Sequence, residues 1–409
     1  MKRDRYDAII IGGGITGAAI AYSLAKNGCN KTLLVEMGQL GGGSTAKAAA
    51  LLSLARDKPH VIQYVRETYS QINELASGDS ASLGFRRVGG CHVASSDAMV
   101  QTIYDIAAVA AECGIRSDVI SNGELETRIP WINTSNIMHS IYYPEEAYVD
   151  TYLLTSAFME YARYKGCEVC CETHAEKIRV ANNSVRGVET DSSFIEANNI
   201  IVASGIWSNL LLSELEFHIP FTPVRSQYWM AAADSDIVNR LQPICIVPDA
   251  KVYTRPDNDN LIFGWREHSS VWVDPHDIPT DVFHYKFSED PDGWENLAGC
   301  VDMFSPFFDG LSDIGIKGHI TGFSGYAPDG LFNVGPVNNI RGLYVAAGCS
   351  GMGVAVCGGI GKAIAELICQ GETDMPLAQF SPDRFGSVNA FSADFMTRCA
   401  KARSGKVSG

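Results

Sequence analysis

Residues 6–36 read YDAIIIGGGITGAAIAYSLAKNGCNKTLLVE, and this stretch decides the fold. Residues 6–11 form a short apolar run typical of a buried strand, and three glycines follow it at the spacing G-x-G-x-x-G. Residues 15–27 have the small and apolar side chains of a helix that lies close to a sheet, and residues 32–35 form a second apolar run. A strand, a glycine turn, a helix and a strand in this order are typical of the unit that binds a dinucleotide.

Each glycine of the motif has its own physical role in such a unit. Gly12 permits the tight exit from the strand, Gly14 lets a pyrophosphate approach the backbone, and Gly17 lets the helix pack closely on the strand. The N-terminus of the helix offers free N–H groups and a partial positive charge to the phosphates. Glu36 ends the second strand, where a carboxylate accepts hydrogen bonds from the ribose hydroxyls of an adenosine. The sequence therefore predicts a dinucleotide site at this turn.

Length and composition favour an α/β enzyme with more than one domain. The chain has 409 residues, of which 46% are hydrophobic and 39 are glycine, and this length exceeds one ordinary core. The formal net charge of −15 argues against nucleic acid or an anionic membrane as a partner. Residues 1–5, MKRDR, lead into the first strand without the apolar segment of a signal peptide, and no stretch is long enough to span a membrane. We therefore expect a cytoplasmic protein.

The twelve cysteines are scattered through apolar stretches, unlike the dense disulfide framework of a small secreted domain. Cys167 and Cys170 form a C-x-x-C pair next to Cys171, but no second pair lies at metal-ligand spacing. We expect reduced, buried strand cysteines and no metal site.

The segment after Glu36 predicts a second contact with the cofactor. Ser44 and Thr45 can cap a helix and donate to a phosphate, and residues 46–50 include alanines small enough to pass under a flat ring. A plain capped helix is the alternative. Farther along, residues 59–75 have the pattern of an amphipathic surface helix, and residues 124–130 are expected to form an irregular connection.

Residues 167–204 alternate like a hairpin that returns to the sheet, and residues 200–208 form a buried strand that ends in Ser204 and Gly205. Small residues at the carboxyl end of a strand suit another close approach to a cofactor.

Residues 217–319 are rich in β-branched and aromatic residues and predict a largely antiparallel sheet that walls a pocket. Its polar or aromatic pocket candidates are Tyr228, Tyr253, Arg255 and Trp265, for which simple packing within the sheet is the alternative.

The C-terminal block has the same pattern as residues 6–27: a buried strand at residues 340–348 is followed by a helix of small residues. This helix region contains too many glycines for a helix chosen only for stability, because each costs about 1 kcal/mol relative to alanine. They are Gly351, Gly353, Gly358, Gly359 and Gly361. We expect a flavin to press against this backbone.

Together, the two glycine-rich blocks resemble the FAD-dependent amine and amino-acid oxidoreductases of the D-amino-acid oxidase, glycine oxidase and sarcosine oxidase superfamily, over nearly the whole chain. Three segments are most similar to the flavin part of dimethylglycine and sarcosine dehydrogenases: VYTRPDNDNLIFGWRE (252–267), GYAPDG (325–330) and SGMGVAVCGGIGKAIAELICQGETD (350–374). Those enzymes carry a further folate-binding domain, for which this sequence has no counterpart.

The resemblance implies an α/β plus α+β architecture with two discontinuous domains. A Rossmann-like FAD-binding domain would comprise residues 1–85, 145–215 and 320–409. A second domain for the substrate, residues 86–144 and 216–319, would be built on a large and mostly antiparallel sheet.

The resemblance also implies FAD as the cofactor, with hydride transfer from an amine-bearing carbon to flavin N5 that gives an imine. The candidate catalytic residues are Tyr253, Met352 and Lys47. The implied FAD-binding positions fall into four groups: Gly12, Gly14, Ile15, Thr16 and Gly17; Glu36, Ser44, Thr45, Lys47 and Ala48; Ala203, Ser204 and Gly205; Gly351, Met352, Gly353 and Val354.

Departures from the family pattern bear on how the flavin is held. The dimethylglycine-type enzymes attach flavin through a His whose position corresponds to Lys47, and the monomeric sarcosine oxidases through a Cys whose position corresponds to Gly322. The resemblance therefore implies noncovalent FAD.

Further departures bear on the reaction. The Arg that binds the substrate carboxylate in glycine oxidases corresponds to Ser324, and Arg225, Arg255 and Arg266 are open alternatives. The Lys that activates oxygen in monomeric sarcosine oxidase falls near Ile262, which favours an electron acceptor other than oxygen.

The leading hypothesis is a dehydrogenase or oxidase of a small amino acid or of an N-methylated or secondary amine. One alternative is a flavoprotein that oxidises a residue of a partner protein, as in maturation of a peptide-derived quinone cofactor. Another is a flavin-binding electron-transfer subunit of a hetero-oligomer.

Overall fold

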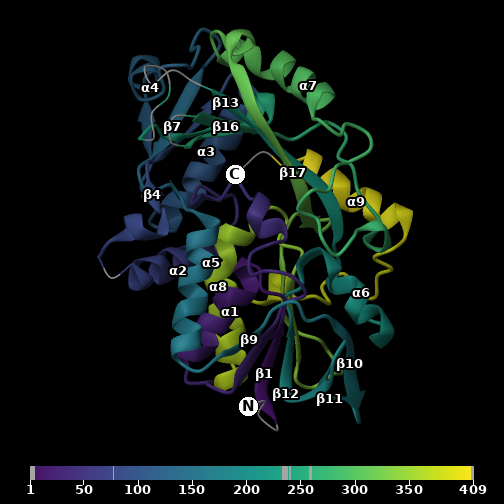
Figure 1. The fold of residues 1–409 in the computed structure, drawn as a ribbon. Coiled ribbons are helices and arrows are strands. Elements are labelled where there is room, and N and C mark those ends of the chain that lie inside the picture. The colour runs from purple at the N-terminus through teal and green to yellow at the C-terminus, as the bar shows by residue number, and fades with distance from the viewer. Residues whose placement is uncertain (1–4, 77, 233–237, 239–240, 258–259, 407–409) are drawn as a thin grey trace.

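The computed structural model describes residues 5–406 except 77, 233–237, 239–240 and 258–259, so most of the N-terminal MKRDR segment lies outside the described residues. Two large sheets lie one above the other in the view of Figure 1, and the chain passes between them several times. This arrangement confirms the predicted Rossmann-like part with a second, mostly antiparallel sheet. The predicted domain boundaries stay a prediction.

The first sheet is built around the strand that precedes the glycine motif. β1 pairs in parallel with β2 and β12, and the C-terminal β19 pairs in parallel with β12. Antiparallel pairing of β10, β11 and β12 confirms the predicted hairpin. The strands are β1 (Tyr6–Ile11), β2 (Thr32–Val35), β9 (Glu168–Cys170), β10 (Ala175–Ala181), β11 (Ser184–Thr190), β12 (Phe194–Val202), β18 (Asn333–Pro336) and β19 (Leu343–Ala347).

Helices cover one face of this sheet. α1 (Ile15–Lys26), α5 (Thr151–Tyr164) and α8 (Gly353–Cys369) lie side by side against the strands in Figure 1, and α2 (Pro59–Leu75) packs on α8. Ala8 and Ile10 of β1 belong to the core beneath these helices, whereas Ile9 and Ile11 pack in the core on the opposite face. Burial on both faces explains why β1 is an unbroken apolar run.

The second sheet joins two distant stretches of the chain, because β14 pairs in parallel with β5. Its remaining pairings are antiparallel. The strands are β5 (Gly90–Ala94), β6 (Asp118–Ile120), β7 (His139–Tyr143), β13 (Thr222–Ala232), β14 (Ile244–Val247), β15 (Val252–Asp257), β16 (Asn260–Trp265) and β17 (Gly315–Tyr326).

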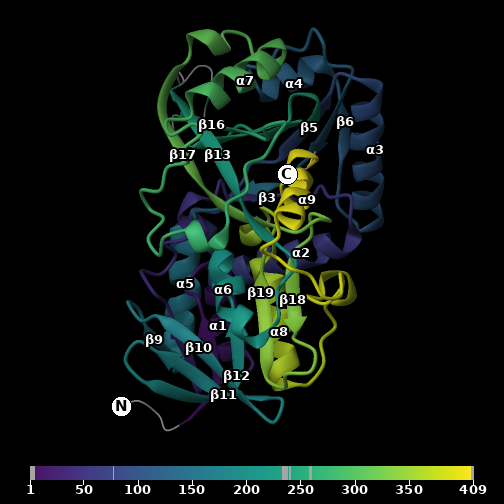
Figure 2. The same ribbon diagram turned by 90° about the vertical axis from the view of Figure 1, so that its right-hand side faces the viewer.

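Each strand of a small third sheet lies at a point where the chain passes from one large sheet to the other. These strands are β3 (Leu51–Leu52), β4 (Arg86–Arg87) and β8 (Ala147–Tyr148). The remaining helices are α3 (Asp97–Glu112), α4 (Asn122–Arg128), α6 (Ser208–Leu212), α7 (Trp294–Phe304) and α9 (Ala393–Ser404). Figure 2 shows α9, the last helix, lying beside the second sheet, where it contacts β13 and β17.

One sequence-based expectation about local structure is wrong, and a second is confirmed with an addition. Residues 124–130 are mostly helical, because α4 is stabilised by a capping box in which Ser121 and Glu124 bond each other's backbone N–H groups. The region 217–319 forms a largely antiparallel sheet as predicted and also contains α7, whose Leu297, Cys300 and Phe304 pack on the second sheet.

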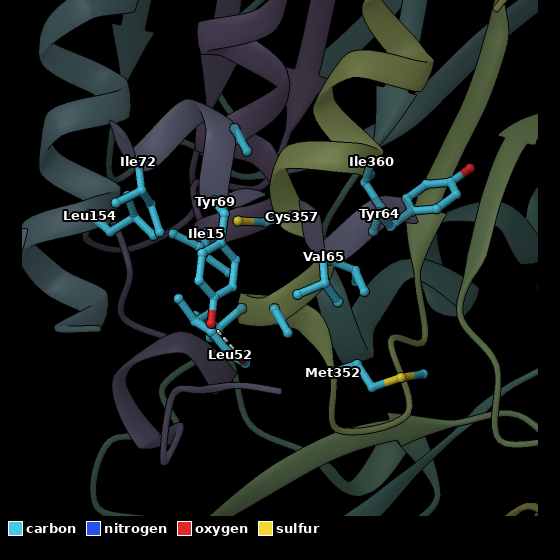
Figure 3. Close-up of a cluster of buried hydrophobic side chains, with 14 of the residues drawn as sticks. Ile15, Leu52, Tyr64, Val65, Tyr69, Ile72, Leu154, Met352, Cys357 and Ile360 are labelled. Carbon is cyan, nitrogen blue, oxygen red and sulfur yellow. Dashed lines mark hydrogen bonds between the residues drawn. The ribbon is translucent and has the colours of Figure 1, made fainter. Parts of the chain in front are cut away.

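The α2 segment is an amphipathic surface helix as predicted, because one face is exposed at Gln63, Arg66 and Ser70 while the other is buried. Tyr64, Val65, Tyr69 and Ile72 are buried, and Figure 3 shows these side chains meeting residues of α8 such as Ile360. The Tyr69 hydroxyl donates to the carbonyl oxygen of Leu52 at 2.7 Å, which ties α2 to β3.

Three of the five predicted flavin-contact glycines, those at 358, 359 and 361, are packed against protein instead. A Cβ atom at Gly358 or Gly359 would lie 2.6 or 2.5 Å from the Cα of Thr68 or Tyr64, and one at Gly361 would lie 2.5 Å from the Ala19 carbonyl oxygen. These glycines therefore permit close packing of α8 on α2 and α1. A flavin does not press on them.

Within the described part of the chain, no helix is long and apolar enough to cross a membrane. The twelve cysteines are free thiols, and the described residues contain no group of three or more candidate metal ligands.

Candidate functional site

The predicted dinucleotide motif opens one large cavity of about 860 Å³. β1, β2, β12 and β19 run parallel, so their carboxyl ends meet at the same edge of the sheet. The residues after these strands, including Gly12, Glu36, Ala203 and Gly348, line the cavity. A cavity at this edge is where open parallel sheets bind ligands.

The glycine turn is shaped by close backbone contacts. Gly12 has a φ of +109°, and a Cβ atom there would lie 2.5 Å from the Ala203 carbonyl oxygen. A Cβ atom at Gly17 would lie 1.9 Å from the Gly12 carbonyl oxygen, so Gly17 serves the packing of α1 on β1 and does not line the cavity. Gly14 is open toward the cavity, where its Cβ would meet only the Thr45 hydroxyl at 3.2 Å.

Glu36 is held in place by the backbone. Its two carboxylate oxygens accept hydrogen bonds from the N–H groups of Gly13 at 2.6 Å and Gly38 at 2.8 Å. The carboxylate is therefore fixed beside the turn with remaining lone pairs for further donors, such as ribose hydroxyls.

The segment after Glu36 forms a short 3₁₀ helix at residues 44–47. The Thr45 hydroxyl accepts a hydrogen bond from Ile15 N at 3.0 Å and so fixes the start of α1. The Lys47 amine donates to the Phe283 carbonyl oxygen at 2.9 Å and lies over the Phe283 ring. A Cβ atom at Gly322 would lie 2.9 Å from the Lys47 Cβ, so the two positions that the resemblance compares with sites of flavin attachment adjoin each other.

The start of α8 forms another part of the cavity lining. Gly351, Met352, Gly353 and Val354 line the cavity, and no side chain caps the first turn of α8. The N-cap residue of α1, Gly14, offers no side chain either, and of the first N–H groups of α1 that of Ile15 donates to Thr45, whereas Ser96 and Asp150 cap α3 and α5. The other N–H groups in the first turns of α1 and α8 suit a ligand that is negatively charged or rich in acceptors.

The second sheet forms the roof of the cavity. Tyr228 and Tyr253 line it, and Tyr253 lies over Gly264, where a Cβ atom would approach its ring to 2.2 Å. Burial raises the pKa of Tyr253 to about 12, so its hydroxyl stays protonated at neutral pH. Ser324 also lines the cavity and accepts a hydrogen bond from Ser226 at 3.1 Å.

Of the three arginines that the sequence leaves open, only Arg266 lines this cavity. Arg225 is buried and paired with Glu267. Arg255 donates to the Ala49 carbonyl oxygen and pairs with Asp257. Trp265 packs in the core of the second sheet, as does the strand around Ile262.

The structure brings the predicted site residues together from four distant parts of the chain. The three candidate catalytic residues, Tyr253, Met352 and Lys47, line the same cavity as the predicted cofactor positions, with Gly17 as the exception. These are Gly12, Gly14, Ile15, Thr16, Glu36, Ser44, Thr45, Ala48, Ala203, Ser204, Gly205, Gly351, Gly353 and Val354. Their individual roles stay predictions.

Sequence reasoning missed three cations on the lining, Arg56, Arg403 and Lys406. Arg56 follows β3, and the other two lie in or after α9. No motif marks them, although the arginine in the last turn of α9 is the kind of residue that a helix C-terminus favours.

The residues present fit FAD. A glycine turn open at Gly14, a fixed acid at Glu36 and two helix N-termini whose N-cap residues provide no side-chain cap line one continuous cavity. Its volume lies within the range usual for cofactor sites. When bound, FAD supplies a hydride acceptor.

Comparison with known proteins agrees with this geometry. A family model described as FAD dependent oxidoreductase matches residues 7–367. The chain is 26% identical over 393 residues to human mitochondrial dimethylglycine dehydrogenase, which covers 94% of this chain and 45% of the relative. It is 25% identical over 380 residues to 4-methylaminobutanoate oxidase (formaldehyde-forming) of Paenarthrobacter nicotinovorans, covering 92% of this chain and 45% of the relative. The chain thus spans less than half the length of these relatives.

Solved structures share the fold. L-proline dehydrogenase from P. horikoshii superposes with a TM-score of 0.82 at 22% identity and covers 93% of this chain and 98% of its own. Glycine oxidase from Geobacillus kaustophilus gives a TM-score of 0.78 at 22% identity and covers 93% and 99%. These matches confirm the fold, and the family model over residues 7–367 confirms the predicted superfamily.

Proposed function

Because the chain belongs to the family of FAD-dependent oxidoreductases, we propose that it oxidises the C–N bond of a small amino acid or of an N-methylated or secondary amine. The main observation in support is that one continuous cavity extends from Glu36 past the start of α8 to Tyr228 and Tyr253 of the second sheet. The named activities of the relatives, on dimethylglycine and 4-methylaminobutanoate, support this substrate class.

In this proposal, the protein's own residues mainly bind and orient the flavin and the substrate. The uncapped start of α8 offers N–H groups to the flavin ring, where they favour negative charge. Tyr228 and Tyr253 confine the substrate from the roof and exclude water. Holding the amine-bearing carbon at the flavin is a large part of such catalysis, so an acid–base pair is not required.

Anaerobic titration of the purified protein tests this proposal. We expect the oxidised-flavin absorbance to bleach with at least one member of a panel of glycine, sarcosine, dimethylglycine, proline and 4-methylaminobutanoate. Bleaching by none of them, together with no turnover of an artificial dye, would contradict the proposal. It would favour a partner-protein substrate or an electron-transfer subunit instead.

We expect the flavin to be noncovalent, because Lys47 and Gly322 occupy the two positions where related flavins are attached, and neither offers the His or Cys. Acid precipitation of the holoprotein should leave a yellow supernatant and a colourless pellet. Yellow colour that stays in the washed pellet would show a covalent bond and contradict this prediction.

A further inference from the structure

The C-terminal ends of α1 and α8 lie together. The two helices pack side by side along the first sheet (Figure 1). Asn27 is the C-cap residue of α1 and Gln370 that of α8, and the Gln370 side-chain amide donates to the Asn27 side-chain oxygen at 3.2 Å. Cys369 is the last residue of α8, and Cys29 follows the C-cap of α1 by two residues. Each helix end therefore brings one thiol to the same place.

These two thiols contact each other. The side chains of Cys29 and Cys369 are hydrogen-bonded to each other, and both are free thiols in this structure. The Thr32 hydroxyl also donates to Cys29 Sγ, at 3.7 Å. The sulfurs of a disulfide lie about 2 Å apart, so a hydrogen-bonded pair of thiols needs only a small approach to form that bond.

Exposure distinguishes this pair from another pair of adjacent cysteines. Cys369 is exposed and Cys29 is partly exposed, so a small oxidant in solution can reach both. Cys91 and Cys245 are register partners on β5 and β14, but both are fully buried. Burial raises the pKa of each of these two thiols, which keeps them protonated and unreactive.

One thiol of the exposed pair is prepared to act as a nucleophile. The hydrogen bond from Cys369 is the main cause that lowers the pKa of Cys29 to about 7, and the Thr32 hydroxyl adds to it. Burial and the Asp7 carboxylate oppose this effect. The pKa of Cys369 is raised, because its proton is held in the bond to Cys29. Since two thiolates in contact would repel each other, the pair shares one proton near neutral pH.

We propose that Cys29 and Cys369 form a redox-active pair, which low-molecular-weight disulfides such as oxidised glutathione convert into a disulfide that joins α1 to α8. The Cys29 thiolate attacks one sulfur of oxidised glutathione, forms a mixed disulfide and releases one glutathione thiolate. Cys369 then gives its proton to solvent and attacks the Cys29 sulfur, which releases the second glutathione. Two protein thiols are oxidised, and one glutathione disulfide is reduced to two glutathione molecules.

The disulfide would connect two helices that begin at the candidate site. Ile15 of α1 and Gly353 of α8 are the first residues of these helices, and both line the cavity. A Cβ atom at Gly361 of α8 would lie 2.5 Å from the Ala19 carbonyl oxygen of α1, so the helices are in close contact along their length as well. A covalent bond at their far ends opposes their separation, and it restricts the unfolded chain because the two cysteines are far apart in sequence. We therefore expect the oxidised holoprotein to keep its FAD to a higher temperature.

Incubation of the holoprotein with mixtures of reduced and oxidised glutathione tests the pair. After acid quenching and alkylation in denaturant, mass spectrometry of the digest should find the Cys29 and Cys369 peptides joined, with two hydrogen atoms fewer than the separate peptides. Cys91 and Cys245 should carry the alkyl label and so provide an internal control. Absence of the joined peptides at every mixture, up to oxidised glutathione alone, would overturn the proposal.

Serine variants separate the roles of the two thiols. C369S should accumulate a mixed disulfide of Cys29 with glutathione, because the resolving thiol is absent. C29S should accumulate several-fold less adduct at Cys369. Cys113 is a partly exposed cysteine at the end of α3, so C113S is the matched control and should form the disulfide as the wild type does. More adduct in C29S than in C369S would overturn the assignment of Cys29 as the attacking thiol.

Flavin fluorescence during slow heating measures the consequence for the cofactor. The midpoint of FAD release should be at least about 2 °C higher for the oxidised wild type than for the reduced wild type. The midpoint for C369S should be the same with and without oxidant. Equal midpoints for the two wild-type forms would overturn the effect on the cofactor site. The inference goes beyond the proposed function and is tested without any amine, so it can stand or fail independently of the amine oxidation.

Discussion

Replacement of Gly12 by valine is expected to yield a colourless protein that does not take up added FAD. A side chain at this position meets the Ala203 carbonyl oxygen at 2.5 Å, and the φ of +109° is one that L-residues rarely adopt. The turn cannot yield, because Gly12 N donates to Val35 O and Ala203 N donates to Ile11 O, both at 2.8 Å. The substitution therefore separates β12 from β1 at the point where both meet the cofactor.

Visible absorption of the purified variant, before and after incubation with FAD, measures this effect, and circular dichroism shows whether the fold persists. Gly123 lies in α4, and a Cβ atom added there would meet nothing within 4 Å, so G123A should contain as much FAD as the wild type. G12V purified with a full complement of FAD would contradict the assignment of the cradle.

Gly14→Ala separates cofactor binding from folding. Gly14 has a φ of −69°, which alanine adopts freely, and its added methyl group meets only the Thr45 hydroxyl. We therefore expect G14A to fold but to bind FAD more weakly, because the methyl group occupies the space through which a pyrophosphate approaches the backbone. The dissociation constant of FAD, measured by fluorescence titration of the apoprotein, checks this, and an unchanged constant would contradict it.

The local pattern is sufficient to predict the first sheet, and the reason is physical. Around Gly12 the strand, the turn and the helix follow one another within a short stretch, and each has its own chemical signature. The carboxyl edge of a parallel sheet then brings the residues after β12 and β19 to the same place. Long-range geometry thus follows from a local rule.

Where a sequence-based expectation is wrong, either a local signal was neglected or the signal did not identify the contacting group. Ser121 and Glu124 form a readable capping box, which the expectation of an irregular connection neglects. The glycines at 358, 359 and 361 indicate close approach, but the sequence cannot say what approaches. In the fold, α1 and α2 do so.

The cations of the site could not be predicted, because their positions depend on contacts between remote segments. Arg403 reaches a glutamate 136 residues earlier in the chain. Arg225, Arg255 and Arg266 are equivalent candidates in the sequence, and only their places and contacts in the second sheet separate them. Pairings of this kind leave no periodic trace in a single sequence.

Glu267→Ala is expected to destabilise the protein by about 3–5 kcal/mol, the usual cost of removing one partner from a buried ion pair. Glu267 is 4% exposed and accepts from Arg225 of β13 at 3.3 Å and from Arg403 of α9. Both arginines are buried as well, so alanine would leave two guanidinium groups without their shared acid.

Urea denaturation of the holoprotein, followed through its first unfolding transition, measures this loss. E267Q keeps the acceptor oxygen without the charge and should fall between E267A and the wild type. The exposed pair of Arg116 and Asp118 provides the control, because D118A should cost at most about 1 kcal/mol.

The same variant connects stability to the site. α9 is tied to the second sheet through Arg403, and Lys406 follows two residues after α9 ends. An E267A protein as stable as the wild type would show that this ion pair does not position the C-terminal segment.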